Sequence, residues 1–222
     1  MTEPRFNPEE TTRPDMQRPN IELIQAAGKL PSATLHEAAG KIGALPAAIQ
    51  PVAPDFKICG PAVTVHSPGG DNLWLHRAIY LAKPGDVLVV SVSDVYEHGY
   101  WGEIMSTAAK VRGLAGLVIN GCVRDRRLLS LIGFPVFARG LCIRGTGKDF
   151  GARGWINAPT RFGEVTVNAG DLIVGDEDGV VCIPREDVSR AIAASEAREA
   201  AEADQLKRLK AGESTLSIFG WQ

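Results

Sequence analysis

The sequence predicts an α/β fold with a partly parallel sheet and a helical extension at the C-terminus. Between residues 84 and 140, strand-like and helix-like segments alternate in the order β-α-β-α-β, and this order places successive strands parallel in one sheet. Residues 150–184 have the pattern of β-structure throughout. A long helical pattern then runs from about Glu186 to Ala211.

The first part of the chain predicts two short helices, a strand and a third helix. Residues 21–30 and 34–42 have helical patterns, and each is followed by Gly or Pro. Residues 57–67 are rich in β-branched side chains, which favour a strand. Residues 72–82 have helical spacing and stop before Pro84, so this predicted helix ends there.

The middle of the chain predicts the alternating strands and helices. Strand patterns at 84–94, 114–120 and 134–140 are separated by helical patterns at 102–113 and 126–132. Gly113 and Gly133 suit the residue that follows a helix, and the chain is expected to turn through Gly121. Further on, two strand patterns surround Asp178-Gly179, a dipeptide typical of a hairpin turn.

Three parts are expected along the chain. Residues 1–20 are polar and rich in proline, which predicts a flexible arm, and residues 21–185 form a single α/β catalytic domain. Residues 186–222 form a helix, whose second half has little apolar surface, and a tail that is apolar again at Leu216, Ile218, Phe219 and Trp221. Because an exposed apolar tail is a liability in a monomer, we expect this extension to pack on a neighbouring subunit.

The composition argues against several classes of function. The formal net charge is -2 with no basic stripe, which argues against nucleic acid, and no long apolar run predicts a membrane span. The start of the chain lacks the basic and apolar pattern of a signal peptide. The four cysteines are scattered without a CxxC pair, which is typical of a reducing compartment. We therefore expect a cytoplasmic protein that binds neither nucleic acid nor membrane.

Several catalytic motifs are missing from the sequence. The stretch GTGKD at 145–149 lacks the flanking residues of a phosphate-binding loop and predicts a tight glycine-rich turn. The histidines show no HExxH or HxH spacing, which argues against zinc, and no GxSxG precedes a helix. Lys110 lies among alanines of a predicted helix and Lys148 in the glycine-rich turn, so neither makes a persuasive Schiff-base lysine.

Two predicted helix starts, at Gly102-Glu103 and Arg124-Asp125, carry the remaining polar chemistry. Each follows a strand, and a helix N-terminus offers free backbone N–H groups that bind carboxylates. Arg124 can hold a carboxylate or stabilise an enolate oxygen, and Asp125 can bind a divalent cation. The alternative is structural: Asp125 caps its helix, and Arg124 only pairs with it.

The stretch WGEIMSTAAKVRGLAGLVINGCVRD resembles the signature of the class II pyruvate aldolases that cleave 4-hydroxy-4-methyl-2-oxoglutarate and 4-carboxy-4-hydroxy-2-oxoadipate. The signature positions are Gly99, Glu103, Arg124 and Asp125. The resemblance continues through FPVFARG, RGTGKD and GDLIVGDEDGVVCIP, and it covers most of the chain from about residue 30.

The same fold family includes the regulator of ribonuclease E activity A, which typically lacks a long C-terminal helix and tail. The tail in this sequence therefore favours the aldolase branch. A non-catalytic protein-binding regulator of a ribonuclease is the alternative.

The resemblance implies a layered α/β/β/α sandwich, assembled as a homotrimer or a homohexamer. It implies Mg²⁺ or Mn²⁺ bound directly by Asp125, with Glu103 holding water on the metal. The carboxylate of pyruvate would meet backbone N–H groups at the start of the 102–113 helix, and its keto oxygen would meet Arg124. The implied substrate-binding residues are Gly102, Glu103, Ile104, Met105 and Arg124, together with Asn72 from a loop beside the same cleft.

The implied reaction is retro-aldol cleavage of a 4-hydroxy-2-oxo acid, which releases pyruvate through a metal-stabilised enolate. The same chemistry implies decarboxylation of oxaloacetate as a side activity. Besides Arg124 and Glu103, the resemblance implies a catalytic glutamate from the C-terminal helix of the adjacent subunit, which maps onto Glu199. Glu196 and Glu202 are near alternatives, since the register of an alanine-rich helix is easily misjudged.

Overall fold

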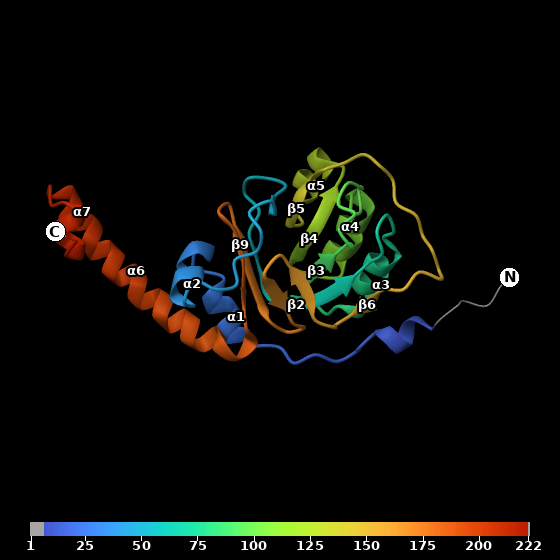
Figure 1. Ribbon diagram of the computed structural model, residues 1–222, viewed down its shortest axis with the longest axis horizontal. Coiled ribbons are helices and arrows are strands. Elements are labelled where there is room, and N and C mark those ends of the chain that lie inside the picture. Colours follow the sequence, from blue (N-terminus) through green and yellow to red (C-terminus); the bar gives the residue numbers. More distant parts are fainter. Residues whose placement is uncertain (1–6, 222) are drawn as a thin grey trace.

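The structure is a computed structural model that describes residues 7–221, and it confirms the α/β class (Figure 1). Its helices are η1 (Pro8–Thr11), α1 (Ile21–Ala27), α2 (Ser32–Ala38), α3 (Leu73–Leu81), α4 (Glu103–Val111), α5 (Arg126–Ile132), η2 (Arg185–Asp187), α6 (Val188–Lys210) and α7 (Thr215–Phe219). Its strands are β1 (Gln50–Pro51), β2 (Ile58–His66), β3 (Val87–Ser91), β4 (Gly116–Val123), β5 (Val136–Leu141), β6 (Trp155–Ile156), β7 (Thr160–Phe162), β8 (Val165–Val167), β9 (Leu172–Asp176) and β10 (Gly179–Ile183).

The main sheet is partly parallel, as the sequence predicts. Its strand order is β1-β5-β4-β3-β2-β9-β10, and β6 also pairs with β2. The neighbours β2, β3, β4 and β5 are parallel, and the helices α3, α4 and α5 connect them in turn. The pairings of β1, β6, β9 and β10 are antiparallel.

Strand β2 changes its partner along its length, and this change creates the second β layer. Residues 58–61 pair with β9, whereas residues 62–66 pair with β3. Beyond β2 the sheet continues into the β9–β10 hairpin, which is buried on both faces.

The β9–β10 hairpin separates two apolar clusters. One cluster, shared with the parallel strands, contains Ile173, Val180 and Cys182, and the other, shared with helices, contains Leu172, Val174, Val181 and Ile183. Successive side chains of a strand point to opposite faces, so alternate residues of the hairpin enter the two clusters. One face of the hairpin therefore packs toward the parallel strands, and the other face packs against helices. Helices α1, α2 and α6 cover the hairpin, and α3, α4 and α5 cover the parallel strands, which confirms the α/β/β/α sandwich (Figure 1).

The chain does not turn at Gly121, contrary to the prediction. Strand β4 runs through this glycine to Val123, with a shift in its register against β5 between Ile119 and Cys122. A Cβ at Gly121 would lie 3.0 Å from Val92 Cγ2 and 3.1 Å from Tyr100 Cδ2. Gly121 therefore permits close packing of the 92–102 loop on the strand, and the turn follows at Arg124.

The predicted hairpin is present, but its turn lies one residue earlier than expected. Strand β9 ends at Asp176 and β10 begins at Gly179, so Glu177 and Asp178 form the turn. The buried carboxylate of Asp176 accepts hydrogen bonds from Ser32 N at 2.8 Å, Ser32 Oγ at 2.6 Å and Asp178 N at 3.1 Å. These bonds tie the turn to the start of α2.

The helical extension predicted at the C-terminus is α6 followed by α7. The buried residues of α6, Val188, Ala191, Ile192 and Ser195, all lie in its first third. Arg198 of α6 still pairs with Glu37 of α2 at 3.7 Å, and the C-terminal part of α6 and α7 then project beyond the body (Figure 1), with exposed side chains at Leu206, Leu216, Phe219 and Trp221. Packing of this extension on a neighbouring subunit stays a prediction.

The N-terminal segment contacts the body at several points. Arg18 donates two hydrogen bonds of 2.8 Å to the buried carboxylate of Asp86, and Arg13 N donates to Ile156 O at 3.2 Å. The division at residues 20 and 185 stays a prediction, and residues 1–6 of the expected arm, like residue 222, lie outside the described part. Within residues 7–221, every helix falls short of the length or the apolar character that crossing a bilayer demands.

Candidate active site

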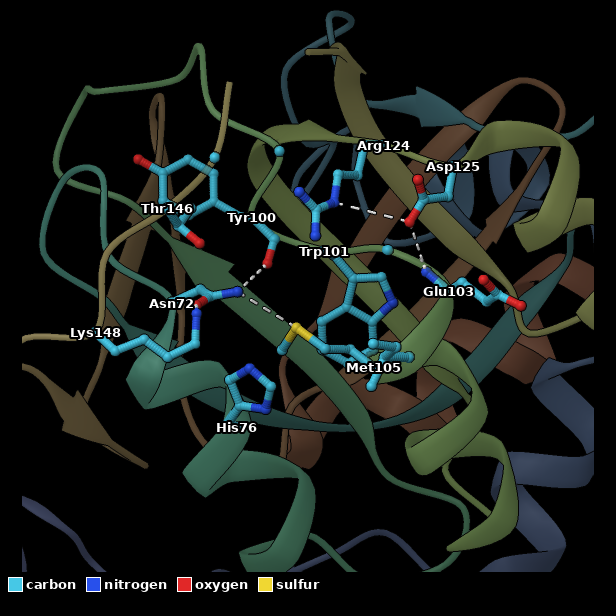
Figure 2. A pocket seen from close by; sticks show the side chains of 14 residues that line it. Asn72, His76, Tyr100, Trp101, Glu103, Met105, Arg124, Asp125, Thr146 and Lys148 are labelled. Carbon is cyan, nitrogen blue, oxygen red and sulfur yellow. Dashed lines mark hydrogen bonds and ion pairs between the residues drawn. The ribbon is translucent and has the colours of Figure 1, made fainter. Parts of the chain in front are cut away.

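The two helix starts that the sequence singles out meet in one cleft at the carboxyl end of the parallel strands. Helix α4 follows β3, and α5 follows β4, so their N-termini open at the same edge of the sheet. The cleft has a volume of about 340 Å³, and Figure 2 shows its lining. Its wall includes all the residues predicted for substrate and metal: Asn72, Gly102, Glu103, Ile104, Met105, Arg124 and Asp125.

Asp125 does not cap its own helix, so the structural alternative for this residue is wrong. It precedes α5 in the left-handed conformation (φ 63°, ψ 32°), and its side chain makes no capping bond to α5. Its Oδ2 instead accepts the N–H of Glu103, the first residue of α4, at 3.1 Å. The carboxylate thus bridges the two helix starts and faces the cleft (Figure 2).

Arg124 and Asp125 form a loose ion pair. The distance between Arg124 Nε and Asp125 Oδ2 is 3.8 Å, and the two side chains are 49% and 35% exposed. Exposed pairs of this kind contribute little to stability, because solvent screens the attraction. Both charges therefore remain accessible to a ligand in the cleft.

Two glycines make room for these charged side chains. A Cβ at Gly102 would lie 2.3 Å from Asp125 Oδ2, a distance that real side chains do not tolerate. A Cβ at Gly99 would lie 2.6 Å from the carbonyl oxygen of Cys142 and 3.1 Å from Arg124 Cδ. Gly99, a position of the signature, and the neighbouring Gly102 are therefore required by the positions of Arg124 and Asp125.

The N-terminus of α4 presents backbone donors to the cleft. The first hydrogen bond within this helix is donated by Ser106 N to Gly102 O at 3.0 Å. The N–H of Glu103 is occupied by Asp125, whereas the N–H groups of Ile104 and Met105 precede the first helical bond. Together with the helix dipole, such groups favour a bound carboxylate.

Asn72 is a fixed part of the cleft wall. It is buried, and its Nδ2 donates to the carbonyl oxygen of Tyr100 at 2.8 Å and to Met105 Sδ at 3.5 Å. These bonds orient its Oδ1, which accepts from Lys148 Nζ at 2.8 Å.

Sequence reasoning missed six other residues of the lining: His76, Tyr100, Trp101, Gly145, Thr146 and Lys148. His76 lies one turn into α3, and the last three belong to the glycine-rich stretch that the sequence suggested only as a tight turn. Asp71 brings that stretch to the cleft, because its carboxylate accepts both Leu73 N at 2.7 Å and Asp149 N at 2.6 Å. The sequence signal that could have identified Thr146 and Lys148 was the family resemblance, which extends over RGTGKD.

The surroundings of His76 disfavour a charge on its ring. Burial lowers the pKa of its imidazole, and the neighbouring Lys148 ammonium lowers that pKa further, against an opposing effect of Asp71. A neutral imidazole both donates and accepts a hydrogen bond. In that form the ring adds polarity to this end of the cleft.

The donor set fits a hard divalent cation held by a single carboxylate. Among residues 7–221, no three His, Cys, Asp or Glu side chains gather in a group that could hold a metal. Mg²⁺ characteristically keeps several waters and binds proteins through one or two carboxylates. Asp125, with Glu103 beside it, supplies oxygen donors of the suitable kind, and the other positions would fall to water or substrate.

Glu199 does not line the cleft of its own chain. It is an exposed residue of α6, as is Glu196. Glu202, the other alternative, pairs with Arg198 at 2.8 Å. A role for Glu199 thus needs a second copy of the chain, and that role stays a prediction.

Comparison with known proteins finds a family model that matches much of the chain. Residues 32–182 match the family model described as "RraA-like: Aldolase/RraA". A protein of Halalkalibacterium halodurans, named "Putative 4-hydroxy-4-methyl-2-oxoglutarate aldolase", is 34% identical over 88% of this chain and 96% of its own length.

Solved structures share the fold. A crystal structure of an uncharacterized protein from Pseudomonas syringae pv. tomato aligns with a TM-score of 0.80 at 24% identity, covering 94% of this chain and 97% of the other. A Streptomyces coelicolor protein, described as an unusual member of the RNase ES inhibitor RraA protein family, aligns with a TM-score of 0.75 at 26% identity. That alignment covers 86% of this chain and 100% of the Streptomyces chain.

Proposed function

The chain belongs to the RraA-like family, and from this premise we propose that it is a class II, divalent-metal-dependent aldolase that cleaves 4-hydroxy-2-oxo acids and releases pyruvate. The observation that carries the proposal is the convergence of Arg124, Asp125 and the open N-terminus of α4 in one cleft. The name of the Halalkalibacterium relative supports the same reaction, with 4-hydroxy-4-methyl-2-oxoglutarate as a substrate.

Binding of the 2-oxo acid uses the donors already in place. The substrate carboxylate accepts from the N–H groups of Ile104 and Met105 at the start of α4. Arg124 lies beside the keto oxygen, where its guanidinium can donate two hydrogen bonds. Asp125, with Glu103 nearby, would hold Mg²⁺ or Mn²⁺.

Cleavage moves one proton and one electron pair. A base removes the proton of the C4 hydroxyl, the C3–C4 bond breaks, and its electrons pass to the pyruvate fragment as an enolate. When bound, a divalent cation supplies Lewis-acid stabilisation of that negative charge. Arg124 supplies a second positive contact at the same oxygen, and Glu103 can hold a water molecule that takes up the proton. Protonation at C3 completes pyruvate, and decarboxylation of oxaloacetate would use the same enolate.

We place the active site at an interface between subunits of a homotrimer or homohexamer, with Glu199 arriving from the neighbour. Next to Arg124 and Asp125 lies a hollow of about 410 Å³ that is also lined by Leu141 and Ile143. Both apolar side chains are exposed in the single chain, Ile143 to 94%. Apolar groups exposed beside a charged cleft favour a covering neighbour.

The decisive experiment follows pyruvate release through a lactate dehydrogenase assay. Protein stripped with EDTA should be inactive toward 4-hydroxy-4-methyl-2-oxoglutarate and oxaloacetate, and Mg²⁺ or Mn²⁺ should restore activity. Borohydride added with substrate should trap no adduct at Lys110 or Lys148. Metal-independent turnover, or a trapped lysine, would reject the class II assignment.

A second function is favoured by the Streptomyces relative, whose description names an RNase ES inhibitor family. A protein-binding regulator of a ribonuclease would release no pyruvate with any metal. The same assay therefore separates the two functions. A panel of C4 methyl and C4 carboxymethyl substrates then identifies the preferred aldol.

A further inference from the structure

Trp101 belongs to the cleft wall, yet the proposed chemistry gives it no role (Figure 2). The residue is fully buried and directly precedes Gly102 and Glu103, where α4 begins. A buried tryptophan usually pairs its indole N–H with an acceptor. The partners of Trp101 therefore show which parts of the molecule it holds together.

The side chain of Trp101 is tied to α4. Its Nε1 donates to Ser106 Oγ at 2.6 Å, and both residues are fully buried. Ser106 lies at the end of the first turn of α4, and its own N–H donates to Gly102 O at 3.0 Å. Two hydrogen bonds with Ser106 thus hold residues 101 and 102 against the first turn of the helix.

The backbone and the ring of Trp101 contact the segment that contains the other helix start. The carbonyl oxygen of Trp101 accepts the N–H of Arg124 at 2.9 Å. The indole stacks on Phe134, which follows α5, with ring centroids 6.0 Å apart and an interplanar angle of 19°. Trp101 therefore connects α4 with both ends of the segment from Arg124 to Phe134.

The guanidinium of Arg124 depends on this backbone contact for its position. The side chain is 49% exposed, and its Nε lies 3.8 Å from Asp125 Oδ2, which is too long for a hydrogen bond. A loose pair of this kind leaves the guanidinium free to follow its own backbone. Whatever fixes the backbone of Arg124 thus decides where its charge can reach.

We propose that Trp101 and Ser106 are positioning residues, which hold Arg124 at a fixed place relative to the donors of α4. The inference deepens the proposed function and rests on it, because it concerns the place of Arg124 beside the keto oxygen. Without the bond from the indole to Ser106, residues 101 and 102 lose their side-chain anchor on α4, and the carbonyl oxygen that holds Arg124 shifts. The donors at the start of α4 belong to the helix itself and keep their places.

The first test compares the steady-state kinetics of Ser106→Ala and the wild type with 4-hydroxy-4-methyl-2-oxoglutarate. We expect kcat to fall by about 10- to 100-fold, the cost of misplacing a reacting group by up to roughly 1 Å. KM should change little, because the donors of α4 stay in place. Trp101→Phe removes the same N–H but keeps an aromatic ring near Phe134, so it should give the same pattern.

Thr64→Val is the matched control for this comparison. It also removes a buried hydrogen bond of 2.6 Å, from Thr64 Oγ1 to Ala158 O, but outside the cleft. Its kcat should equal that of the wild type. If the bond to Ser106 only stabilised the fold, Ser106→Ala would lower the melting temperature and leave the kcat of the folded protein unchanged.

The second test combines Ser106→Ala with Arg124→Ala in one chain. If Ser106 acts through Arg124, the double variant should have the same kcat as Arg124→Ala alone, because coupled residues are not additive. An equal fold-loss of kcat from Ser106→Ala in the presence and in the absence of Arg124 would contradict the proposal. So would a normal kcat in both Ser106→Ala and Trp101→Phe.

The third test measures the positioning without catalysis, through hydrogen exchange of the backbone N–H of Arg124. That N–H is bonded to Trp101 O, so its protection reports the contact directly. Exchange should be about 5- to 100-fold faster in Ser106→Ala, the range that corresponds to leaving one buried donor unpaired, and unchanged in Thr64→Val. Unchanged exchange in Ser106→Ala would overturn the proposal. Failure of the wild type to release pyruvate would instead reject the proposed function, and the exchange measurement would still decide about Trp101 and Ser106.

Discussion

At the scale of single residues, the site depends on the backbone conformation of Asp125. A left-handed backbone conformation at a residue other than glycine is uncommon, and Asp and Asn adopt it most readily. In this conformation the carboxylate turns away from α5 and reaches the N–H of Glu103. The residue type was predictable from the spacing of the signature, but the bond to the other helix start was not, because it depends on backbone angles that no local pattern specifies.

Gly102→Ala tests whether activity requires the free space beside the carboxylate of Asp125. The backbone at Gly102 is extended (φ -160°), a conformation open to any residue, so the damage should come from the new Cβ, which would lie 2.3 Å from Asp125 Oδ2. We expect the melting temperature to change little and the activity to fall by about 100-fold, the cost of displacing a reacting group by roughly 1 Å. Gly151→Ala is the matched control, since Gly151 does not line the cleft and a Cβ there would make only an ordinary contact, 3.4 Å from Asp149 Oδ1. Equal losses in the two variants would contradict this explanation.

Arg124 should act on the transition state more than on binding. Arg124→Ala should lower kcat by about 3 kcal/mol of lost stabilisation, as does removal of one oxyanion donor elsewhere. Arg124→Lys should recover only part of this, because lysine lacks the planar fork of the guanidinium. Steady-state kinetics would measure the kcat and KM of both variants, and Arg127→Ala, at an exposed position of α5, serves as the control. A change confined to KM in both Arg124 variants would argue against the role.

At the scale of elements, the sequence predicts most helices and strands, and the differences have physical causes. Hydrophobic periodicity locates the parallel strands and the helices between them, because the pattern of apolar residues in each segment matches the side chains that it buries. The errors concern glycines. Gly121 lies within β4, where it packs under Val92 and Tyr100, and the hairpin turn lies one residue before the predicted place. A glycine that makes room for a distant side chain cannot be distinguished by sequence alone from one that turns the chain.

The N-terminal segment offers a test at this scale. Arg18 is bound in a bidentate pair to Asp86, whose side chain is fully buried and also accepts Lys83 N at 2.7 Å. Arg18→Ala should lower the free energy of unfolding by about 1.5 to 3 kcal/mol, the usual contribution of a hydrogen bond to a charged group. Urea denaturation measures this, and Arg13→Ala serves as the control because Arg13 uses only its backbone in these contacts. Equal free energies of unfolding in the two variants would mean that the Arg18–Asp86 pair does not stabilise the protein in solution.

At the scale of the whole molecule, the single chain leaves two regions incomplete. Helix α6 runs for 23 residues yet buries only its first third, and exposed apolar side chains lie both on the tail and beside the cleft. The sequence indicated the first region through its scarcity of apolar residues. The second region could not be predicted, because Leu141 and Ile143 come together with Arg124 only through the pairing of β4 and β5.

Mixing inactive variants tests whether the two regions meet in an assembly. Asp125→Asn and Glu199→Ala, dissociated and reassembled together, should regain part of the activity, because some interfaces then combine both wild-type residues. Asp125→Asn mixed with Arg124→Ala should regain none, since these residues come from the same chain. Absence of recovery in the first mixture, after subunit exchange has been demonstrated, would exclude Glu199 from a shared site.

The most direct measurement is the effect of Asp125→Asn on metal binding and pyruvate release together. Asparagine can adopt the left-handed conformation and accept the Glu103 N–H, so the fold should remain intact while the anionic oxygen is lost. We expect calorimetric Mn²⁺ binding and release of pyruvate from 4-hydroxy-4-methyl-2-oxoglutarate to disappear together, with both retained in the control Asp178→Asn at the hairpin turn. Near-normal turnover of Asp125→Asn at ordinary Mg²⁺ concentration would contradict a metal-dependent site built on Asp125.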